Sequence, residues 1–175
     1  MHGRDLHLFV DESKAKAYVM AIATIEGTKV EEARQALRAM RIGGQTSLHF
    51  KRESARRRRA ILAALVEMGW GARIVSSRQS RQDLARGECL SQVVAYASSV
   101  EARQTTLELD ASVERFDRQT LFQLVAQQSL QKSLPYQLVA RPQEPGLWAA
   151  DAIAWSYARG GEWRLRLEAL LGDFS

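Results

Sequence analysis

Residues 6–13 read LHLFVDES, an apolar run that ends in two adjacent carboxylates. Such a run is typical of a buried strand, whose side chains alternate between the two faces of a sheet. Alternation places Asp11 on the face of Phe9 and Glu12 on the opposite face. Taken alone, the acidic pair is explained most simply as the start of a polar turn, because a polar link and a second apolar run follow it.

The remaining chain alternates segments of strand and helix character. We predict further strands at 18–25, 47–50, 70–76, 105–110 and 136–140. Helical spacing predicts helices at 30–40, 55–68, 81–100, 118–131 and 147–158, a turn at 26–29 and an amphipathic tail at 163–171. Ser54 and Gly69 are the expected caps of the second helix. Strands that lead and then alternate with helices predict an α/β fold, a mixed sheet with helices on both faces.

The composition describes one globular domain. The chain has 175 residues, of which 46% are hydrophobic, and we expect a single domain over 1–175. Its one cysteine, Cys89, excludes an intrachain disulfide and suits a reducing compartment. No apolar run approaches the ~20 residues that cross a bilayer, and no export signal precedes the first strand. We therefore expect a cytoplasmic protein.

The positive charge favours an acidic partner. The net charge is +5 and the isoelectric point is about 9.7. Arginine supplies 20 of the 25 cations, and its guanidinium suits bidentate contact with phosphate, although a GC-rich genome produces the same bias. The charge therefore points, if weakly, to nucleic acid as a partner.

Asp151 is the most informative single residue. It is the only charge in an otherwise apolar helical segment, residues 147–155, and burying an unpaired carboxylate costs several kcal/mol. A functional role would explain it. So would an ion pair with an arginine from elsewhere in the chain, or an interaction with the helix dipole after Pro145.

A second acidic pair ends the mid-chain strand. Glu108 and Asp110 stand at i and i+2, so a strand would point both to one face, about 7 Å apart. If this strand lies beside the first, one of them meets Asp11, and that arrangement needs a cation. Carboxylates from two strand ends and a helix are typical ligands of Mg²⁺ or Mn²⁺. Two such ions can activate water and stabilise the leaving oxygen in phosphodiester cleavage.

The segment before the second helix adds further candidates. Glu53 would complete a metal site, and His49 would serve a proton or a phosphate, although a histidine beside a phenylalanine is more often structural. Four arginines follow at 56–59. Since consecutive helical residues wrap around the axis, we interpret them as a solvated face, from which one or two can hold a phosphate backbone.

Other chemistries are excluded by their missing patterns. His2, His7, His49 and Cys89 show no zinc-ligand spacing. The sequence contains neither of the glycine-rich phosphate-binding motifs, nor the G-x-S-x-G nucleophile motif of hydrolases. The carboxylates are therefore the strongest candidates for chemistry.

Four segments together resemble a known family. They are FVDES at 9–13, LHF at 48–50, LELD at 107–110 and LWAADAIAW at 147–155. Their order and spacing resemble those of the bacterial domain of unknown function 3800, which is placed in the ribonuclease H-like superfamily, and the resemblance covers nearly the whole chain. The family often has a glycine after Asp-Glu-Ser, where this chain has Lys14.

The resemblance implies a ribonuclease H-like fold with a metal site. It implies Asp11 as the central ligand on the first strand, Glu108 or Asp110 as the ligand on the mid-chain strand, and Asp151 as the ligand on the last helix. The secondary candidates are Glu12 and Glu53. Of the adjacent acids 11 and 12, we expect the first to be the ligand and the second to be structural.

The leading hypothesis is a divalent-metal-dependent nuclease that uses Mg²⁺ or Mn²⁺ to hydrolyse RNA or DNA. The main alternative is a catalytically inactive ribonuclease H-like module that binds nucleic acid or protein. A third is a hydrolase of another phosphorylated or acidic small molecule. The nuclease hypothesis requires the acids on the first strand, the mid-chain strand and the last helix to converge in the fold.

Overall fold

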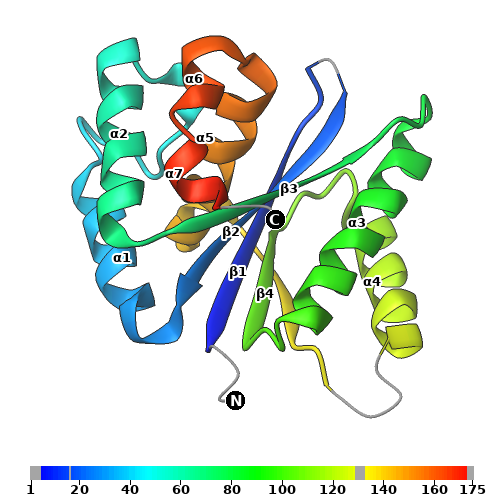
Figure 1. The fold of residues 1–175 in the computed structure, drawn as a ribbon. Coiled ribbons are helices and arrows are strands. Elements are labelled where there is room, and N and C mark those ends of the chain that lie inside the picture. Colours follow the sequence, from blue (N-terminus) through cyan, green and yellow to red (C-terminus); the bar gives the residue numbers. More distant parts are fainter. Residues whose placement is uncertain (1–4, 16, 129–132, 173–175) are drawn as a thin grey trace.

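The computed structural model describes residues 5–15, 17–128 and 133–172. Its centre is a five-stranded sheet in the order β3-β2-β1-β4-β5 (Figure 1). The strands are β1 (Leu6–Ser13), β2 (Tyr18–Glu26), β3 (Gly71–Ser77), β4 (Gln104–Glu108) and β5 (Tyr136–Val139). β2 pairs antiparallel with β1 and β3, whereas β4 pairs parallel with β1 and β5. The predicted mixed sheet is confirmed.

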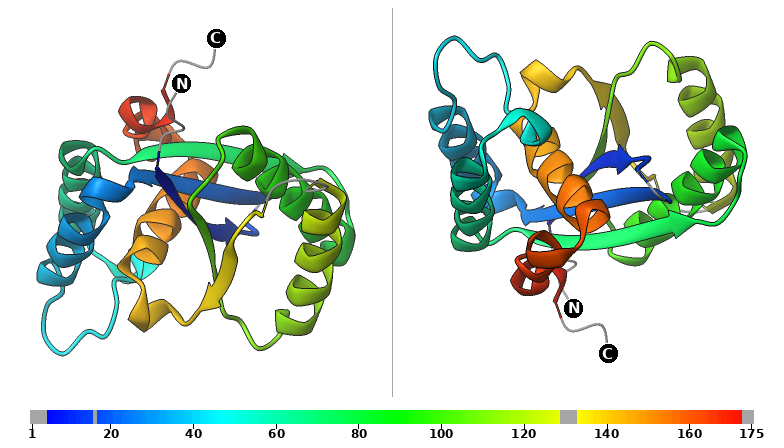
Figure 2. Two further views of the ribbon diagram at one scale, coloured as in Figure 1. Left: turned by 90° about the horizontal axis from the view of Figure 1, so that it is seen from below. Right: turned by 90° about the horizontal axis from the view of Figure 1, so that it is seen from above.

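Helices cover both faces of this sheet, as predicted (Figure 2). One face carries α1 (Gly27–Ala39), the 3₁₀ turn η1 (Phe50–Arg52), α2 (Ala55–Met68), α5 (Pro145–Arg159), α6 (Gly161–Leu165) and α7 (Glu168–Leu171). The other face carries α3 (Gln82–Ser99) and α4 (Glu114–Gln128). A second 3₁₀ turn, η2 (Arg141–Gln143), links β5 to α5.

The alternation of β1 divides the core in two. Phe9 packs with α1, α2 and α5, whereas Leu8 and Val10 pack with α3 and α4. Helix α5 lies directly on β1, and Gly146 makes this approach possible, because a Cβ there would overlap the Phe9 ring. The two faces of β1 are buried by different helical layers. The next two side chains of the strand, Asp11 and Glu12, therefore point to opposite sides of the sheet.

The predicted caps of α2 are confirmed. The Ser54 hydroxyl accepts a hydrogen bond from the Arg57 amide at 3.2 Å, which satisfies one free donor of the first turn. Gly69 ends the helix in the left-handed region, at φ 86°. Local sequence therefore determines where this helix starts and stops.

Three predicted local features are wrong. Residues 26–29 form no turn, because α1 begins at Gly27, whose amide donates to the Asp5 carbonyl at 2.6 Å. Residues 47–50 form no strand; they instead bury Leu48 and Phe50 in the core beside α5, and Phe50 is the first residue of η1. Helix α4 begins at 114 rather than 118 because its first turn carries an acid, Asp117, that is buried in an ion pair. The predicted end of this helix at 131 lies outside the described residues.

None of the helices in the described part of the chain has the length and apolar character needed to cross a membrane.

Candidate metal centre

Three carboxylates from distant parts of the chain meet at the ends of β1 and β4. The two strands are parallel, with Val10 of β1 in register with Leu107 of β4, so Asp11 and Glu108 follow side by side. Helix α5 crosses β1 on the face of Phe9 and contributes Asp151. We call this group, Asp11, Glu108 and Asp151, the carboxylate cluster.

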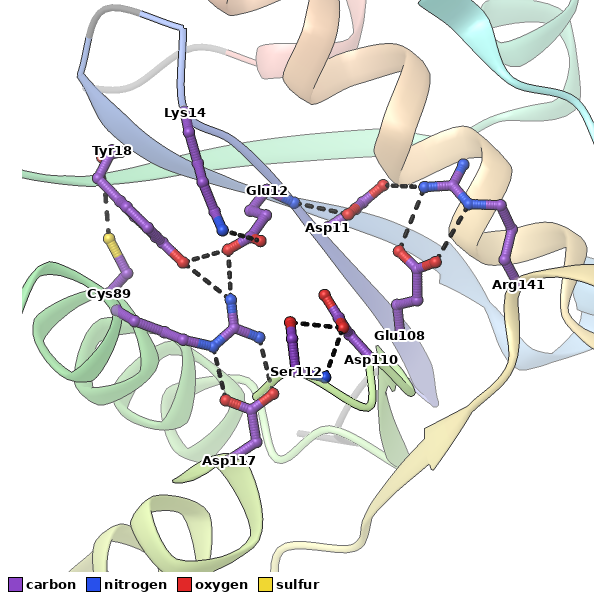
Figure 3. A network of polar contacts seen from close by, with 11 residues as sticks. Asp11, Glu12, Lys14, Tyr18, Cys89, Glu108, Asp110, Ser112, Asp117 and Arg141 are labelled. Atoms are coloured by element: carbon purple, nitrogen blue, oxygen red, sulfur yellow. Dashed lines mark hydrogen bonds and ion pairs between the residues drawn. The ribbon is translucent and has the colours of Figure 1, made fainter. Parts of the chain in front are cut away.

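One arginine contacts all three members of the carboxylate cluster. Arg141 Nη2 lies 2.9 Å from Asp11 Oδ2, and Nε and Nη2 each donate to Glu108 at 3.2 Å (Figure 3). Arg141 Nη1 lies 3.1 Å from Asp151 Oδ2. This last contact is an ion pair without hydrogen-bond geometry, since Nη1 is buried and has no hydrogen-bond partner. The guanidinium thus stands where the sequence predicted a cation.

The cluster is short of positive charge. Three acids surround one guanidinium, and Asp11 is only 8% exposed. Burial, and then the neighbouring Asp151, raise the pKa of Asp11 from 3.8 to about 8, although Arg141 opposes the shift. Burial also opposes the charge on Arg141, but the three acids raise the pKa of its guanidinium above the usual range. A further cation would stabilise the ionised cluster.

Asp151 is held by two contacts. The Phe50 amide donates to Asp151 Oδ2 at 3.0 Å, so the segment predicted as a strand orients this acid. Of the structural explanations considered for Asp151, the arginine ion pair is the one present. The helix-dipole explanation is wrong, because α5 starts at Pro145 and Asp151 lies beyond its first turn.

Asp110 binds a neighbouring residue, Ser112, whereas Glu108 binds Arg141. β4 ends at Glu108, and Asp110 accepts hydrogen bonds from the Ser112 amide at 2.9 Å and hydroxyl at 2.7 Å. These bonds hold the pKa of Asp110 below its usual value. Asp110 and Glu108 do line one small pocket of about 20 Å³, room for about one water. Only Glu108 of the two contacts Arg141 (Figure 3).

Glu53 belongs to a separate structural ion pair. It is buried, accepts from Arg57 Nε at 2.6 Å, and accepts from Gln45 Nε2 at 2.9 Å. Arg57 in turn donates to the Met40 carbonyl at 2.7 Å, which ties α2 to the end of α1. The structure therefore places Glu53 in contact with α2 rather than among the carboxylate cluster.

His49 directly precedes Phe50, whose amide binds Asp151 of the cluster. Burial lowers the pKa of its imidazole, and the charges of Arg141 and Arg52 lower it further. The ring is therefore neutral at pH 7, with one nitrogen able to accept a proton. Of the candidate residues outside the cluster, His49 is the one whose ionisation responds to Arg141 and two of the cluster acids.

Glu12 is part of a second ionic network on the opposite face of the sheet. It pairs with Arg86 and Lys14 and accepts a hydrogen bond from the Tyr18 hydroxyl (Figure 3). Arg86 also donates to both oxygens of Asp117, at 2.6 and 2.7 Å. We call this group, Glu12, Lys14, Tyr18, Arg86 and Asp117, the Glu12 network.

The arginine run at 56–59 is not simply a solvated face. Arg57 pairs with Glu53, and Arg59 pairs with Glu162 at 2.9 Å. Arg58 lies 4.3 Å from the centre of the Trp155 ring and donates to the Phe50 carbonyl at 2.8 Å. The prediction of a solvated face is wrong for Arg57 and Arg58, which are half-buried against their partners, and is confirmed for Arg56 and Arg59, which are exposed. The exposed cations of this region are Lys51, Arg52, Arg56 and Arg59, and Arg59 is the one paired with Glu162.

The acids of the carboxylate cluster are arranged around a guanidinium. Within residues 5–15, 17–128 and 133–172, no group of three or more His, Cys, Asp or Glu side chains is placed to hold a metal ion. The oxygens of the cluster lie 2.9–3.2 Å from nitrogens of Arg141, whereas Mg²⁺ would require oxygens at ~2.1 Å from a single centre. The all-oxygen ligand set nevertheless suits Mg²⁺ or Mn²⁺.

Sequence reasoning missed Arg141. It foresaw an arginine partner for Asp151 only as an alternative to function, and nothing in an Arg-Pro pair between strand and helix separates this arginine from the other 19. The position becomes visible only when β4 and β5 pair, because η2 follows β5 directly and so lies beside the end of β4.

Comparison with known proteins agrees on the fold. No protein-family model matches the sequence, and no curated protein matches it either. Among solved structures, a chain of the PCNA:RNase HII complex from Archaeoglobus fulgidus is similar over 98% of this chain and 80% of its own, with a TM-score of 0.55 and 14% identity. The ribonuclease H-like fold is thus confirmed, whereas the likeness to the domain of unknown function 3800 stays a resemblance.

Proposed function

We propose that this protein is a divalent-metal-dependent nuclease that hydrolyses phosphodiester bonds of RNA or DNA. Asp11, Glu108 and Asp151 are the proposed ligands of Mg²⁺ or Mn²⁺. The observation that carries the proposal is their convergence on one cation position, although they are separated by up to 140 residues of sequence. The ribonuclease H-like fold supports it, since the similar solved chain comes from a complex that contains an RNase HII.

The elements of the fold suit the proposed chemistry. β1 and β4 are central strands, so they hold Asp11 and Glu108 on a rigid base, and the Phe50 amide orients Asp151. When bound, a divalent ion supplies an activated water and stabilises the charge of the leaving oxygen. We assign the role of proton acceptor to His49, because its imidazole is neutral and the adjacent Phe50 amide binds Asp151.

The remaining candidates take supporting roles in the proposal. Exposed cations next to His49, namely Lys51, Arg52 and Arg56, hold the phosphate backbone. Asp110 lines the same small pocket as Glu108 and is the reserve ligand. Glu53 keeps Arg57, and through it α2, in place.

The test combines metal binding with cleavage. Mn²⁺ binding is measured by calorimetry for the wild type and for Asp11→Asn, Asp151→Asn, Glu108→Gln and Asp110→Asn. The same proteins are incubated with labelled single- and double-stranded RNA and DNA in Mg²⁺ or Mn²⁺. Asp83→Asn is the matched control, because Asp83 is exposed and pairs only with Arg81 at the start of α3.

We expect the wild type and Asp83→Asn to bind Mn²⁺ and to cleave. Asp11→Asn and Asp151→Asn should lose more than about 100-fold in activity, beyond the 10–100-fold typical of residues behind a metal ligand. The Glu108 and Asp110 variants then decide which acid of the pair is the ligand. Absence of Mn²⁺ binding at millimolar concentration, or cleavage unaffected by both Asp variants, would overturn the proposal.

A second candidate function is a ribonuclease H-like module that binds nucleic acid without cleaving it. The observation that favours it is Arg141, which already contacts each acid of the cluster. In that case the labelled nucleic acids are not cleaved, and fluorescence anisotropy of the same labelled strands shows binding that is independent of Mn²⁺ and of Asp11→Asn.

A further inference from the structure

Arg141 and a metal ion need the same oxygen atoms. Asp11 Oδ1 accepts the Glu12 amide at 2.8 Å, which leaves Oδ2 for a cation, and Arg141 contacts that oxygen at 2.9 Å. Asp151 likewise presents Oδ2 both to the Phe50 amide and to Arg141. Two of the oxygens that a metal ion would use, Asp11 Oδ2 and Asp151 Oδ2, are therefore in contact with the guanidinium.

The two cations also differ in the spacing they require. Arg141 holds the acids with N···O distances of 2.9–3.2 Å, whereas Mg²⁺ requires oxygens at ~2.1 Å in a near-octahedral shell. Two cations a few Å apart also repel each other, and more strongly when one of them is divalent. Binding of the ion and residence of the guanidinium are mutually unfavourable.

The Arg141 side chain can leave while its backbone stays. Trp148 Nε1 donates to the Arg141 carbonyl at 2.7 Å, and the Glu144 amide donates to the same oxygen at 3.3 Å. By contrast, Nη1 of the guanidinium has no hydrogen-bond partner, and the side chain is 13% exposed. The other guanidinium nitrogens are held by hydrogen bonds to Asp11 and Glu108, so the side-chain contacts are the ones that a divalent ion would replace, whereas the backbone contacts are independent of the cluster.

We infer that Arg141 is an internal competitor for the metal, whose guanidinium occupies the carboxylate cluster until a divalent ion displaces it. The inference rests on the proposed function, because it takes the cluster to be the metal site. It sets the metal affinity of the protein below that of the three acids alone. The ion-free protein keeps its acids together through an intramolecular ion pair.

The test measures Mn²⁺ affinity by calorimetry in wild-type protein and in Arg141→Gln. Removal of the competitor should lower the dissociation constant at least about 10-fold. Arg141→Lys, which keeps one charge but loses the bidentate fork, should fall between the two. Arg34→Gln is the matched control, because Arg34 forms a comparable part-buried pair with Glu144, at 2.8 Å, outside the cluster.

The outcomes separate this inference from the proposed function. Equal or weaker Mn²⁺ binding by Arg141→Gln, with clear binding by the wild type, overturns the competition and leaves the metal site standing. Absence of binding in every protein overturns both. Circular dichroism identifies a variant that does not fold, and if Arg141→Gln fails to fold, the affinity of Arg141→Lys relative to wild type decides.

Discussion

The carboxylate cluster and the Glu12 network start from adjacent residues of β1 but differ in charge balance. The Glu12 network sets Glu12 and Asp117 against Arg86 and Lys14, and each nitrogen of the Arg86 guanidinium donates to a partner. The carboxylate cluster sets three acids against Arg141 alone, and one of its nitrogens has no hydrogen bond.

The difference separates a structural ion network from a candidate site. A buried network with matched charges and satisfied donors holds α3, α4 and the β1–β2 hairpin together and needs no ligand. A cluster with excess negative charge at the carboxyl ends of two central strands stabilises any cation that reaches it. Composition alone does not distinguish the two, because both contain acids around an arginine.

The largest expected effect comes from removing each central arginine. Arg86→Met leaves Glu12 and Asp117 without their main partner and should lower the free energy of unfolding by about 3–5 kcal/mol. Arg141→Met should cost less, because Glu108 is 30% exposed, and Mn²⁺ should restore what is lost. Urea denaturation with and without Mn²⁺ measures both. If Mn²⁺ raised the free energy of unfolding of both variants equally, the carboxylate cluster would not differ from the Glu12 network as a cation site.

Next in size is the contrast between the neighbouring acids themselves. Asp11→Asn should reduce cleavage by more than about 100-fold. Glu12→Gln should cleave within a few-fold of wild type below its unfolding temperature, yet unfold at a lower temperature, because it weakens the pair with Arg86. Initial cleavage rates beside thermal unfolding curves test this. A loss of cleavage in folded Glu12→Gln would place both acids in the site.

A smaller effect is expected in the pH dependence of stability without metal. The pKa of Asp11 is about 8 in the folded protein and 3.8 for an ordinary aspartate. Between these values the folded state holds a proton that the unfolded state has lost, so the free energy of unfolding falls as pH rises from about 4 to 8.

Asp11→Asn cannot ionise and should escape that loss. In chelator at pH 8.5 it should be more stable than wild type by about 1–2 kcal/mol, and the advantage should vanish near pH 4. Urea titrations across this range measure it. Glu12→Gln is the comparison from the other face, and no such gain is expected there because its carboxylate has matched partners.

The smallest effect is expected in nucleic-acid affinity, when an exposed arginine is removed beside the carboxylate cluster or beside the Glu12 network. Arg52→Ala, next to His49, should weaken nucleic-acid binding by a few-fold and reduce the slope of log affinity against log salt by about 1. Arg118→Ala, on α4 and paired with Glu114 at 3.0 Å, should leave both unchanged. Fluorescence anisotropy at several salt concentrations distinguishes them. Equal effects would point to unspecific attraction by the whole charge.

Local sequence predicted the parts of the fold that neighbouring residues control. Alternation in β1 placed Asp11 and Glu12 on opposite faces, and Ser54 and Gly69 bounded α2, because both depend on a few consecutive residues. The prediction at 47–50 failed because the amide of Phe50 has its partner in Asp151, 101 residues away, instead of in a neighbouring strand.

The amino-acid pattern was sufficient to predict the layered fold and to identify Asp11, Glu108, Asp110 and Asp151 as candidate ligands. Periodicity and burial are encoded by residues close together, so β1, β4 and α5 and their acids were identifiable. The pairing of distant strands was needed to show that Glu108 rather than Asp110 belongs to the carboxylate cluster, and that Arg141 lies within this cluster. Ion pairing in three dimensions depends on strand order and helix crossing, and nothing near Arg141 in the sequence records either.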